Sequence, residues 1–172
     1  DLAAARAGLV DRGPGVQVRL SSGTLQSVDE TALLGGANLA AIGDGSSDNW
    51  EVFQFAQAEL VAPGTYWLTH RLRGQAGTDA LMPSVWPAGS RFVLLDRVPP
   101  QLELSPNLRR IVQHFRIGPV KRPLSDPSYL HQEAAFDGNG LRPLSPCHLR
   151  ADSQDEDINL NWTRRTRVGG DS

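Results

Sequence analysis

The sequence is poor in three features that would each point to a class of protein. It has a single cysteine, Cys147, which excludes an internal disulfide and any metal site built from several cysteines. It has no basic excess, since 17 lysines and arginines stand against 19 aspartates and glutamates, so we expect no nucleic-acid partner. None of its apolar runs approaches the roughly 18 residues that span a bilayer, so we expect no membrane span.

Sequence motifs of catalysis are missing as well. The chain contains no G-x-S-x-G elbow, no P-loop and no H-E-x-x-H pair. The four histidines are scattered along the sequence, and none lies within metal-pair spacing of another: His70, His114, His131 and His148. We therefore predict that this segment is not an enzyme and has no catalytic residues, no metal and no cofactor.

Turn-forming residues and short alternating runs are plentiful instead. The chain has 17 glycines and 12 prolines, which favour many turns and short strands. About nine short strands and two helical turns can be counted, and they predict an all-β fold, an antiparallel sandwich or barrel-like domain with short helical turns. The residues expected in its core are Phe53, Phe55, Leu68, Leu72, Phe92, Leu94 and Ile111.

Several local predictions are open to a direct check. Residues 1–10 are rich in alanine and leucine and suit a short helix, whereas 16–20 and 24–28 suit a first hairpin. Residues 91–96 should be a strand that is covered on both faces. Residues 129–137 fit either a strand or two turns of helix, and we favour the strand.

The stretch "LRGQAGTD" (72–79) raises the question of a ligand site. Gly74 and Gly77 permit a sharp bend, and Arg71 and Arg73 should share a strand face near carboxylates such as Asp79 or Glu51. A structural corner is the favoured interpretation, with anion or glycan binding as the alternative. The residues of a possible ligand or partner surface are Trp67, Arg71, Arg73, Gln75 and Trp86.

Three blocks of sequence resemble one protein family. They are "WEVFQFAQAELVAPGTYWLTHRLRGQAGTDALM", "PAGSRFVLLD" and "RPLSPCHLRA…INLNWTRRTRVGGDS". Together they resemble the C-terminal region of the gene transfer agent and phage tail host specificity proteins, also described as baseplate hubs of the "megatron" type. The resemblance covers roughly residues 35–172 and is weaker over residues 1–34.

This resemblance implies a structural module of a phage-like tail baseplate or tail tip, which contributes to tail assembly and host-surface attachment. It implies other tail proteins as partners and a homotrimer within the full-length protein. The protein would be made in the bacterial cytoplasm and released in a virion-like particle, and any glycoside-hydrolase-type activity of the family would lie outside this segment. The alternative is a carbohydrate-binding module for host cell-surface polysaccharide.

The last thirty residues resemble the opening of a fibronectin type III module. "SPCHLRAD" would be its first strand and "INLNWTRRT" its second, with Trp162 as the core tryptophan. Such a module needs about 100 residues, so we expect it to be incomplete in a segment of a longer polypeptide. The predicted organisation is the tail of a preceding element over 1–14, an all-β domain over 15–140 and the start of this module over 141–172.

Overall fold

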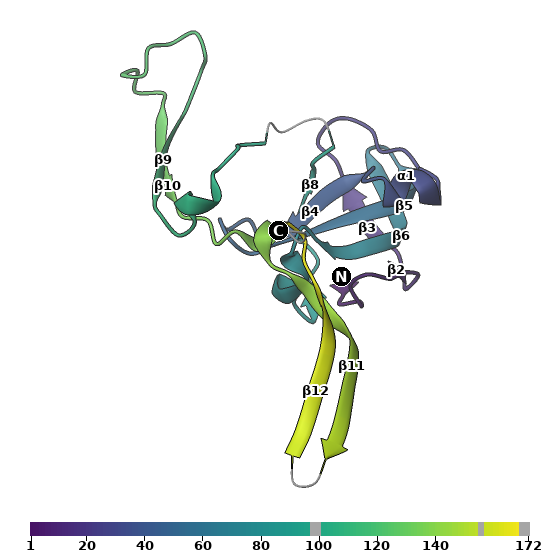
Figure 1. Cartoon of the computed structure of the whole chain (residues 1–172). Helices are drawn as coiled ribbons and strands as arrows, with labels where there is room; N and C mark the ends of the chain where they lie inside the picture. Colours follow the sequence, from purple (N-terminus) through teal and green to yellow (C-terminus); the bar gives the residue numbers. More distant parts are fainter. Residues whose placement is uncertain (97–100, 155–156, 169–172) are drawn as a thin grey trace. The chain divides into compact units, whose positions relative to one another are not determined.

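The computed structural model describes residues 1–96, 101–154 and 157–168 (Figure 1). The chain forms two compact units, Asp1–Leu102 (unit 1) and Glu103–Ser172 (unit 2). Strand accounts for 45% and helix for 9% of the structure, with antiparallel sheets, which confirms the all-β fold. Within the described ranges, none of the helices has the length and apolar character required to cross a membrane.

Unit 1 is built around one antiparallel six-stranded sheet. The long strand β6 (Thr65–Gln75) pairs with β5 (Trp50–Ala62) on one side, across a turn at Pro63 and Gly64. On its other side it pairs with two short strands in succession, β2 (Val10–Asp11) and β3 (Val16–Arg19). Beyond β5 the sheet continues through β4 (Leu39–Gly43) to β8 (Arg91–Leu94).

Short elements complete unit 1. Strands β1 (Leu2–Ala3) and β7 (Val85–Trp86) form a separate antiparallel pair. Helix α1 (Glu30–Leu34) begins after Asp29, whose carboxylate accepts the Ala32 N–H at 2.7 Å, as the acidic start of this segment predicts. The 3-10 helix η1 (Thr78–Leu81) follows the end of β6.

The core of unit 1 consists of two apolar clusters. The larger contains Phe53, Phe55 and Leu68, all fully buried, together with Leu2 and Trp86 from the β1–β7 pair. The smaller contains Leu33 of α1, Ala56 and Leu72, with Val10 and Val28 packed against it. Phe53, Phe55, Leu68 and Leu72 are thus confirmed as core residues, whereas Phe92 and Leu94 are only half-buried.

Three local predictions for unit 1 are wrong. Residues 1–10 contain the starts of two strands and no helix, and β3 pairs with β6 instead of residues 24–28. The latter segment lies along β5 without forming a strand, with the Val28 N–H donating to the Ala56 carbonyl at 2.7 Å. Strand β8 is covered on one face only, because Val93 is 40% exposed at the edge of the sheet.

Unit 2 consists of two hairpins with short connecting 3-10 turns. Strand β9 (Gln113–Ile117) pairs with β10 (Leu130–Ala134), and β11 (Leu144–Gln154) pairs with β12 (Asp157–Arg165). The turns are η2 (Pro106–Leu108) and η3 (Asn139–Leu141). The strand favoured within 129–137 is therefore confirmed, as is the hairpin expected near the end of the chain.

The described residues of unit 2 contain no buried side chain. Ile111, expected in the core, is 52% exposed, because it precedes β9 in a segment that no other layer covers. The division between the units also differs from the predicted boundary near residue 140. Residues 103–140 lie with the C-terminal hairpin in unit 2, and residues 1–14 contribute strands to unit 1.

We predict that Phe53→Ala lowers the free energy of unfolding of unit 1 by about 3–5 kcal/mol, because it leaves a cavity in the larger cluster. Leu60→Ala is the matched control, since Leu60 lies on the same strand and is 61% exposed. It should change the free energy by less than about 0.5 kcal/mol. Urea unfolding followed by tryptophan fluorescence measures both, and equal losses would contradict this description of the core.

Candidate functional site

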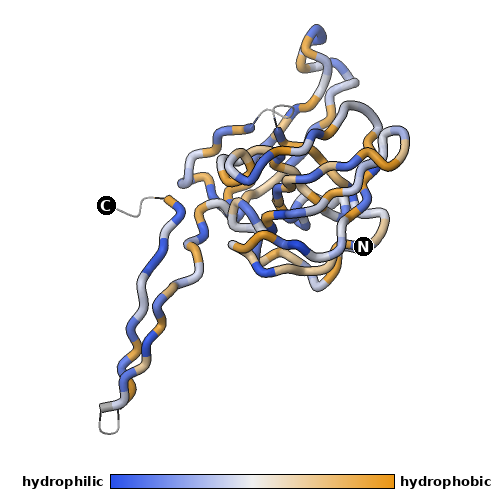
Figure 2. The backbone as a smooth tube through the Cα atoms, turned by 90° about the vertical axis from the view of Figure 1, so that its right-hand side faces the viewer, coloured by the Kyte–Doolittle hydropathy of each residue, from blue (hydrophilic) through white to orange (hydrophobic). Residues whose placement is uncertain are grey.

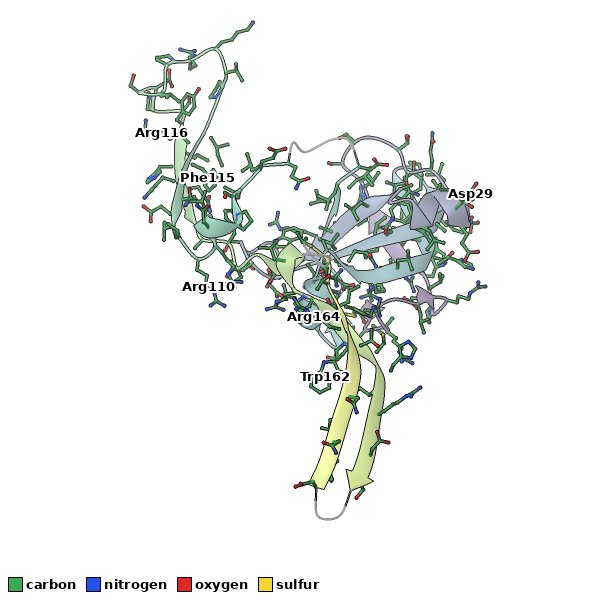
Figure 3. All side chains as sticks on the ribbon, viewed as in Figure 1. Asp29, Arg110, Phe115, Arg116, Trp162 and Arg164 are labelled. Carbon is green, nitrogen blue, oxygen red and sulfur yellow. The ribbon has the colours of Figure 1, made fainter. Side chains whose placement is uncertain are left out.

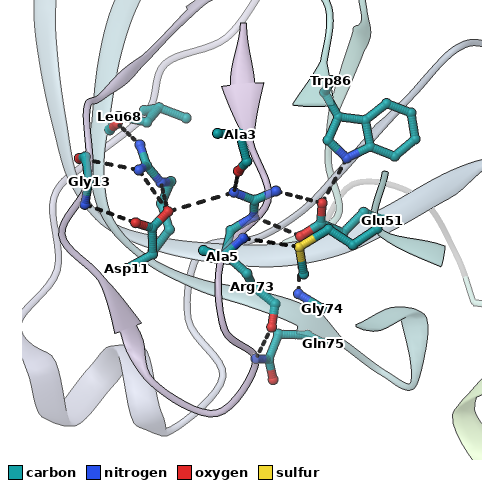
Figure 4. A network of polar contacts seen from close by, with 12 residues as sticks. Ala3, Ala5, Asp11, Gly13, Glu51, Leu68, Arg73, Gly74, Gln75 and Trp86 are labelled. Atoms are coloured by element: carbon teal, nitrogen blue, oxygen red, sulfur yellow. Dashed lines mark hydrogen bonds and ion pairs between the residues drawn. The ribbon is translucent and has the colours of Figure 1, made fainter. Parts of the chain in front are cut away.

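A network of four charged side chains lies within unit 1 (Figure 4). Arg73 and Glu51 are both fully buried and form a two-pronged ion pair, with Nε–Oε1 at 2.7 Å and Nη2–Oε2 at 2.8 Å. The Trp86 indole N–H donates to Oε2 of the same carboxylate at 2.7 Å. Glu51 therefore holds β5, β6 and β7 together through one side chain.

The second half of the network contains Arg71 and Asp11. Arg71 donates from Nη2 and Nε to Asp11 Oδ2, at 2.8 and 3.0 Å, and from Nη1 to the Leu68 carbonyl at 2.9 Å. Arg73 joins the two halves, since its Nη1 lies 3.6 Å from Asp11 Oδ2 and donates to the Ala3 carbonyl at 2.7 Å. Two cations and two anions thus balance one another.

The carboxyl group of Asp11 has a pKa below its ordinary value. Burial acts to raise it, but hydrogen bonds from the Gly13 N–H and from Arg71, with the charges of Arg71 and Arg73, outweigh burial. Because the folded-state pKa is below the unfolded-state value of about 3.9, the ionised form stabilises the fold above about pH 4. That contribution is lost as the pH falls through the lowered pKa.

The inward direction of both arginines results from an irregularity in β6. His70 has a positive φ of 53°, and the alternation of faces shifts there. Leu68 packs in the larger cluster and Leu72 in the smaller, although simple alternation would place both on one face. Arg71 pairs across the sheet with the buried Phe55, so its side chain lies on the core side.

The stretch that follows is a structural corner, as favoured from its sequence. Gly74 has a φ of 62°, and a Cβ at this position would lie 2.7 Å from Asp79 Cα, so glycine is required. The Gly74 N–H donates to Glu51 Oε1 at 3.1 Å, which ties the corner to the ion pair. The Thr78 hydroxyl accepts the Val52 N–H at 2.9 Å and so fixes the start of η1 against β5.

The five residues of the predicted ligand surface therefore do not lie on one surface. Arg71, Arg73 and Trp86 are buried in the network, with exposures of 2% or less. Gln75 is half-buried and donates to the Arg73 carbonyl of its own strand at 3.2 Å. Trp67 alone of the five is exposed, at 39%. Among the described residues, every buried side-chain nitrogen and oxygen has a hydrogen-bond partner.

Trp67 borders a shallow groove of about 460 Å³ on the outer face of β5 and β6. Polar side chains share its lining with the indole: Ser27, Gln57, Glu59 and Thr69. An exposed aromatic face beside carboxylate, amide and hydroxyl groups can stack on the apolar side of a sugar and bond its hydroxyls. A larger groove of about 510 Å³ lies where the two edge strands β3 and β8 approach one another, and apolar residues such as Val18 and Phe92 line it.

A cluster with metal-binding donors lies in unit 2. The donor atoms of His114, His131 and Glu133 all lie within 4.8 Å of one another, and all three side chains are exposed. Sequence spacing does not reveal this group, because the histidines are 17 positions apart along the chain. Cross-strand pairing of β9 with β10 brings them together.

Comparison with known proteins identifies a family. The family model described as "Rcc01698-like, C-terminal" matches residues 1–93, which is more than half of the chain. The chain belongs to this family. No curated protein matches it. The matched region includes the whole charge network of unit 1, from Asp11 to Trp86. It begins and ends earlier than the region of roughly 35–172 over which the sequence blocks resemble tail proteins.

We predict that Glu51→Gln destabilises unit 1 by about 3–5 kcal/mol, because it removes the two-pronged partner of a fully buried cation and leaves Arg73 only the longer 3.6 Å contact with Asp11. Glu59→Gln removes the same charge from an exposed position of the same strand and should change the free energy of unfolding by less than about 0.5 kcal/mol. Urea unfolding at neutral pH measures both. A Glu51→Gln variant as stable as Glu59→Gln would show that the ion pair does not stabilise the fold.

Proposed function

We propose that this chain is a non-enzymatic structural module of a phage-like tail baseplate or tail tip. The observation that carries the proposal is the exposure of large apolar side chains across unit 2, where no described residue is buried. These side chains are at least 37% exposed: Leu104, Ile111, Val112, Ile117, Val120, Leu124, Leu130, Phe136, Leu141, Leu149, Ile158, Leu160, Trp162 and Val168. Apolar surface of this extent is typical of a segment that is covered in an assembly.

In the C-terminal hairpin, the exposed apolar side chains of β12 lie on one face of the strand. Ile158, Leu160 and Trp162 alternate along β12 and are 57–70% exposed. Across the ladder, Leu160 pairs with Ala151 of β11. Figure 2 shows apolar and polar residues alternating along this hairpin, and Figure 3 shows the Trp162 ring projecting from it. An isolated two-stranded hairpin is marginally stable in water, so a partner that covers this face would stabilise it.

Sequence resemblance indicates which kind of assembly would cover this surface. The blocks at 50–82, 87–96 and 142–172 resemble tail host specificity proteins, whose role is to build the end of a tail and contact the host. The proposed partners are therefore other tail proteins and further copies of this chain in a homotrimer. The proposed location is the tail of a particle that is made in the bacterial cytoplasm and released.

The buried charges of unit 1 support a non-enzymatic role. Glu51 and Asp11 each bond an arginine, and Glu51 also accepts from an indole and a backbone N–H. A carboxylate whose acceptor positions are occupied in this way cannot readily take a proton from a substrate. The network is suited to holding strands together.

We predict that Leu160→Asp, introduced into the protein in cells that make the particles, reduces incorporation of the chain by about tenfold or more, because it places a charge on the apolar face. Asn161→Asp is the matched control, since its neighbouring position on β12 points to the opposite, polar face. Quantitative mass spectrometry of purified particles measures incorporation. Wild-type particles without the chain would refute the proposed function, and equal incorporation of both variants would refute the role of this face.

The Trp67 groove supports a second function, binding of host cell-surface polysaccharide. We predict that Trp67→Ala lowers binding to such a polysaccharide by about tenfold or more, which corresponds to about 1.4 kcal/mol. Trp162→Ala is the control, because it removes another exposed indole from a different unit. A glycan array carrying bacterial surface polysaccharides compares the three proteins. Absence of wild-type binding, or equal loss in both variants, would exclude the groove as a sugar site.

A further inference from the structure

We propose that His114, His131 and Glu133 bind one divalent transition-metal ion, for which Zn²⁺ is the best match, on one face of the β9–β10 hairpin. This inference is independent of the function proposed above. It rests on the register of the hairpin, on the distances between the donor atoms and on the chemistry of those donors. Phe115 and Arg116, labelled in Figure 3, mark the position of the hairpin.

The register of the two strands places all three side chains on the same face. Glu133 pairs directly with His114 across the antiparallel ladder, so their side chains project from the same side. His131 lies two residues before Glu133 on β10, and alternate residues of a strand share a face. The register of the two strands therefore fixes the grouping.

The distances between the donors fit a small tetrahedral ion. His114 Nδ1 lies 3.1 Å from His131 Nε2 and 3.3 Å from Glu133 Oε1. Ligands at about 2.0–2.1 Å from a tetrahedral Zn²⁺ lie about 3.3–3.4 Å apart. The imidazole rings are nearly parallel, with centroids at 5.3 Å and an interplanar angle of 13°. Both rings would turn about their side-chain bonds to direct the two nitrogen lone pairs to one ion.

The donor set is selective for a class of metal. Two imidazole nitrogens and one carboxylate oxygen suit Zn²⁺ and related transition metals, whereas Mg²⁺ and Ca²⁺ prefer oxygen ligands throughout. Three protein ligands leave a fourth tetrahedral position for water, to which this solvent-exposed site gives access. Both histidines must supply an unprotonated nitrogen to the ion, so binding would replace the close His114–His131 contact.

One positive charge lies on the same face. Arg116 pairs with His131 across the ladder, and its guanidinium donates to the Leu124 carbonyl in the connection between the strands. This hydrogen bond holds the guanidinium against the backbone of the connection. Glu133 supplies the negative charge of the ligand set. The ion would join β9 to β10 directly. It would so stabilise a hairpin that has no core of its own, since no described side chain of unit 2 is buried.

The test is isothermal titration of the metal-free full chain with Zn²⁺. We expect one ion per chain, with an affinity that falls by more than about tenfold in His114→Asn, in His131→Asn and in Glu133→Gln, since loss of even an outer-shell partner costs about 10–100-fold. His148→Asn is the matched control. His148 lies on β11 with a φ of 54°, a conformation that asparagine tolerates, and its replacement should leave the affinity unchanged.

Amide hydrogen exchange provides a second measurement that does not depend on heat of binding. Saturating Zn²⁺ should slow exchange in Gln113–Ile117 and Leu130–Ala134 of the wild type and of His148→Asn, but not of His131→Asn. Metal-free exchange of Gln113–Ile117 equal to that of the wild type would verify that the hairpin is unaltered in each variant, and unchanged exchange of Phe53 and Leu68 would verify the same for unit 1. Failure of the wild type to bind up to millimolar Zn²⁺ would overturn the proposal. So would an equal loss of affinity in His148→Asn, or an unchanged affinity in Glu133→Gln.

Discussion

Two guanidinium groups, those of Arg71 and Arg73, lie inside unit 1, and the arrangement of the strands around them follows from the need to neutralise both. Arg73 requires Glu51 from β5, and Arg71 requires Asp11 from β2. The pairing of Asp11 keeps β2 at the edge of β6, while the Trp86 indole and the Ala3 carbonyl attach the β1–β7 pair. A buried ion pair contributes little net stability compared with apolar packing, but this register of the strands satisfies the hydrogen bonds of both guanidinium groups.

The sequence predicts the strands of this fold better than it predicts where their side chains point. Alternation locates β5 and β6 and identifies Phe53, Phe55 and Leu68 as core residues. It does not indicate the positive φ of His70, because nothing in the alternating pattern of residues 65–75 marks that position. The arginines after His70 are therefore inside, although an exposed ligand surface was the alternative considered for them. An arginine on a strand face needs a nearby anion, and the sequence offers Asp79 and Glu51 for this role. The structure pairs Arg73 with Glu51.

The histidine cluster is a kind of site that sequence motifs do not predict. Metal-site motifs rely on ligands that are close in sequence, as on one helix or in one loop. His114 and His131 are instead joined by strand pairing, which depends on the register of the hairpin. Only Glu133 and His131 have a spacing, two residues on one strand, that sequence alone could have marked as sharing a face. A search of cross-strand positions in predicted hairpins would have found this group.

The two units differ in what they bury. Unit 1 has an apolar core in two clusters and includes charges that must be satisfied there, whereas the described part of unit 2 has exposed apolar side chains and no core. Chain entropy opposes the ordering of such hairpins, so their order must come from contacts outside the ladder. The proposed partner on the apolar face would meet this requirement for β11–β12, and the proposed metal ion would meet it for β9–β10. The two hairpins would then become ordered under different conditions, one by assembly and the other by metal.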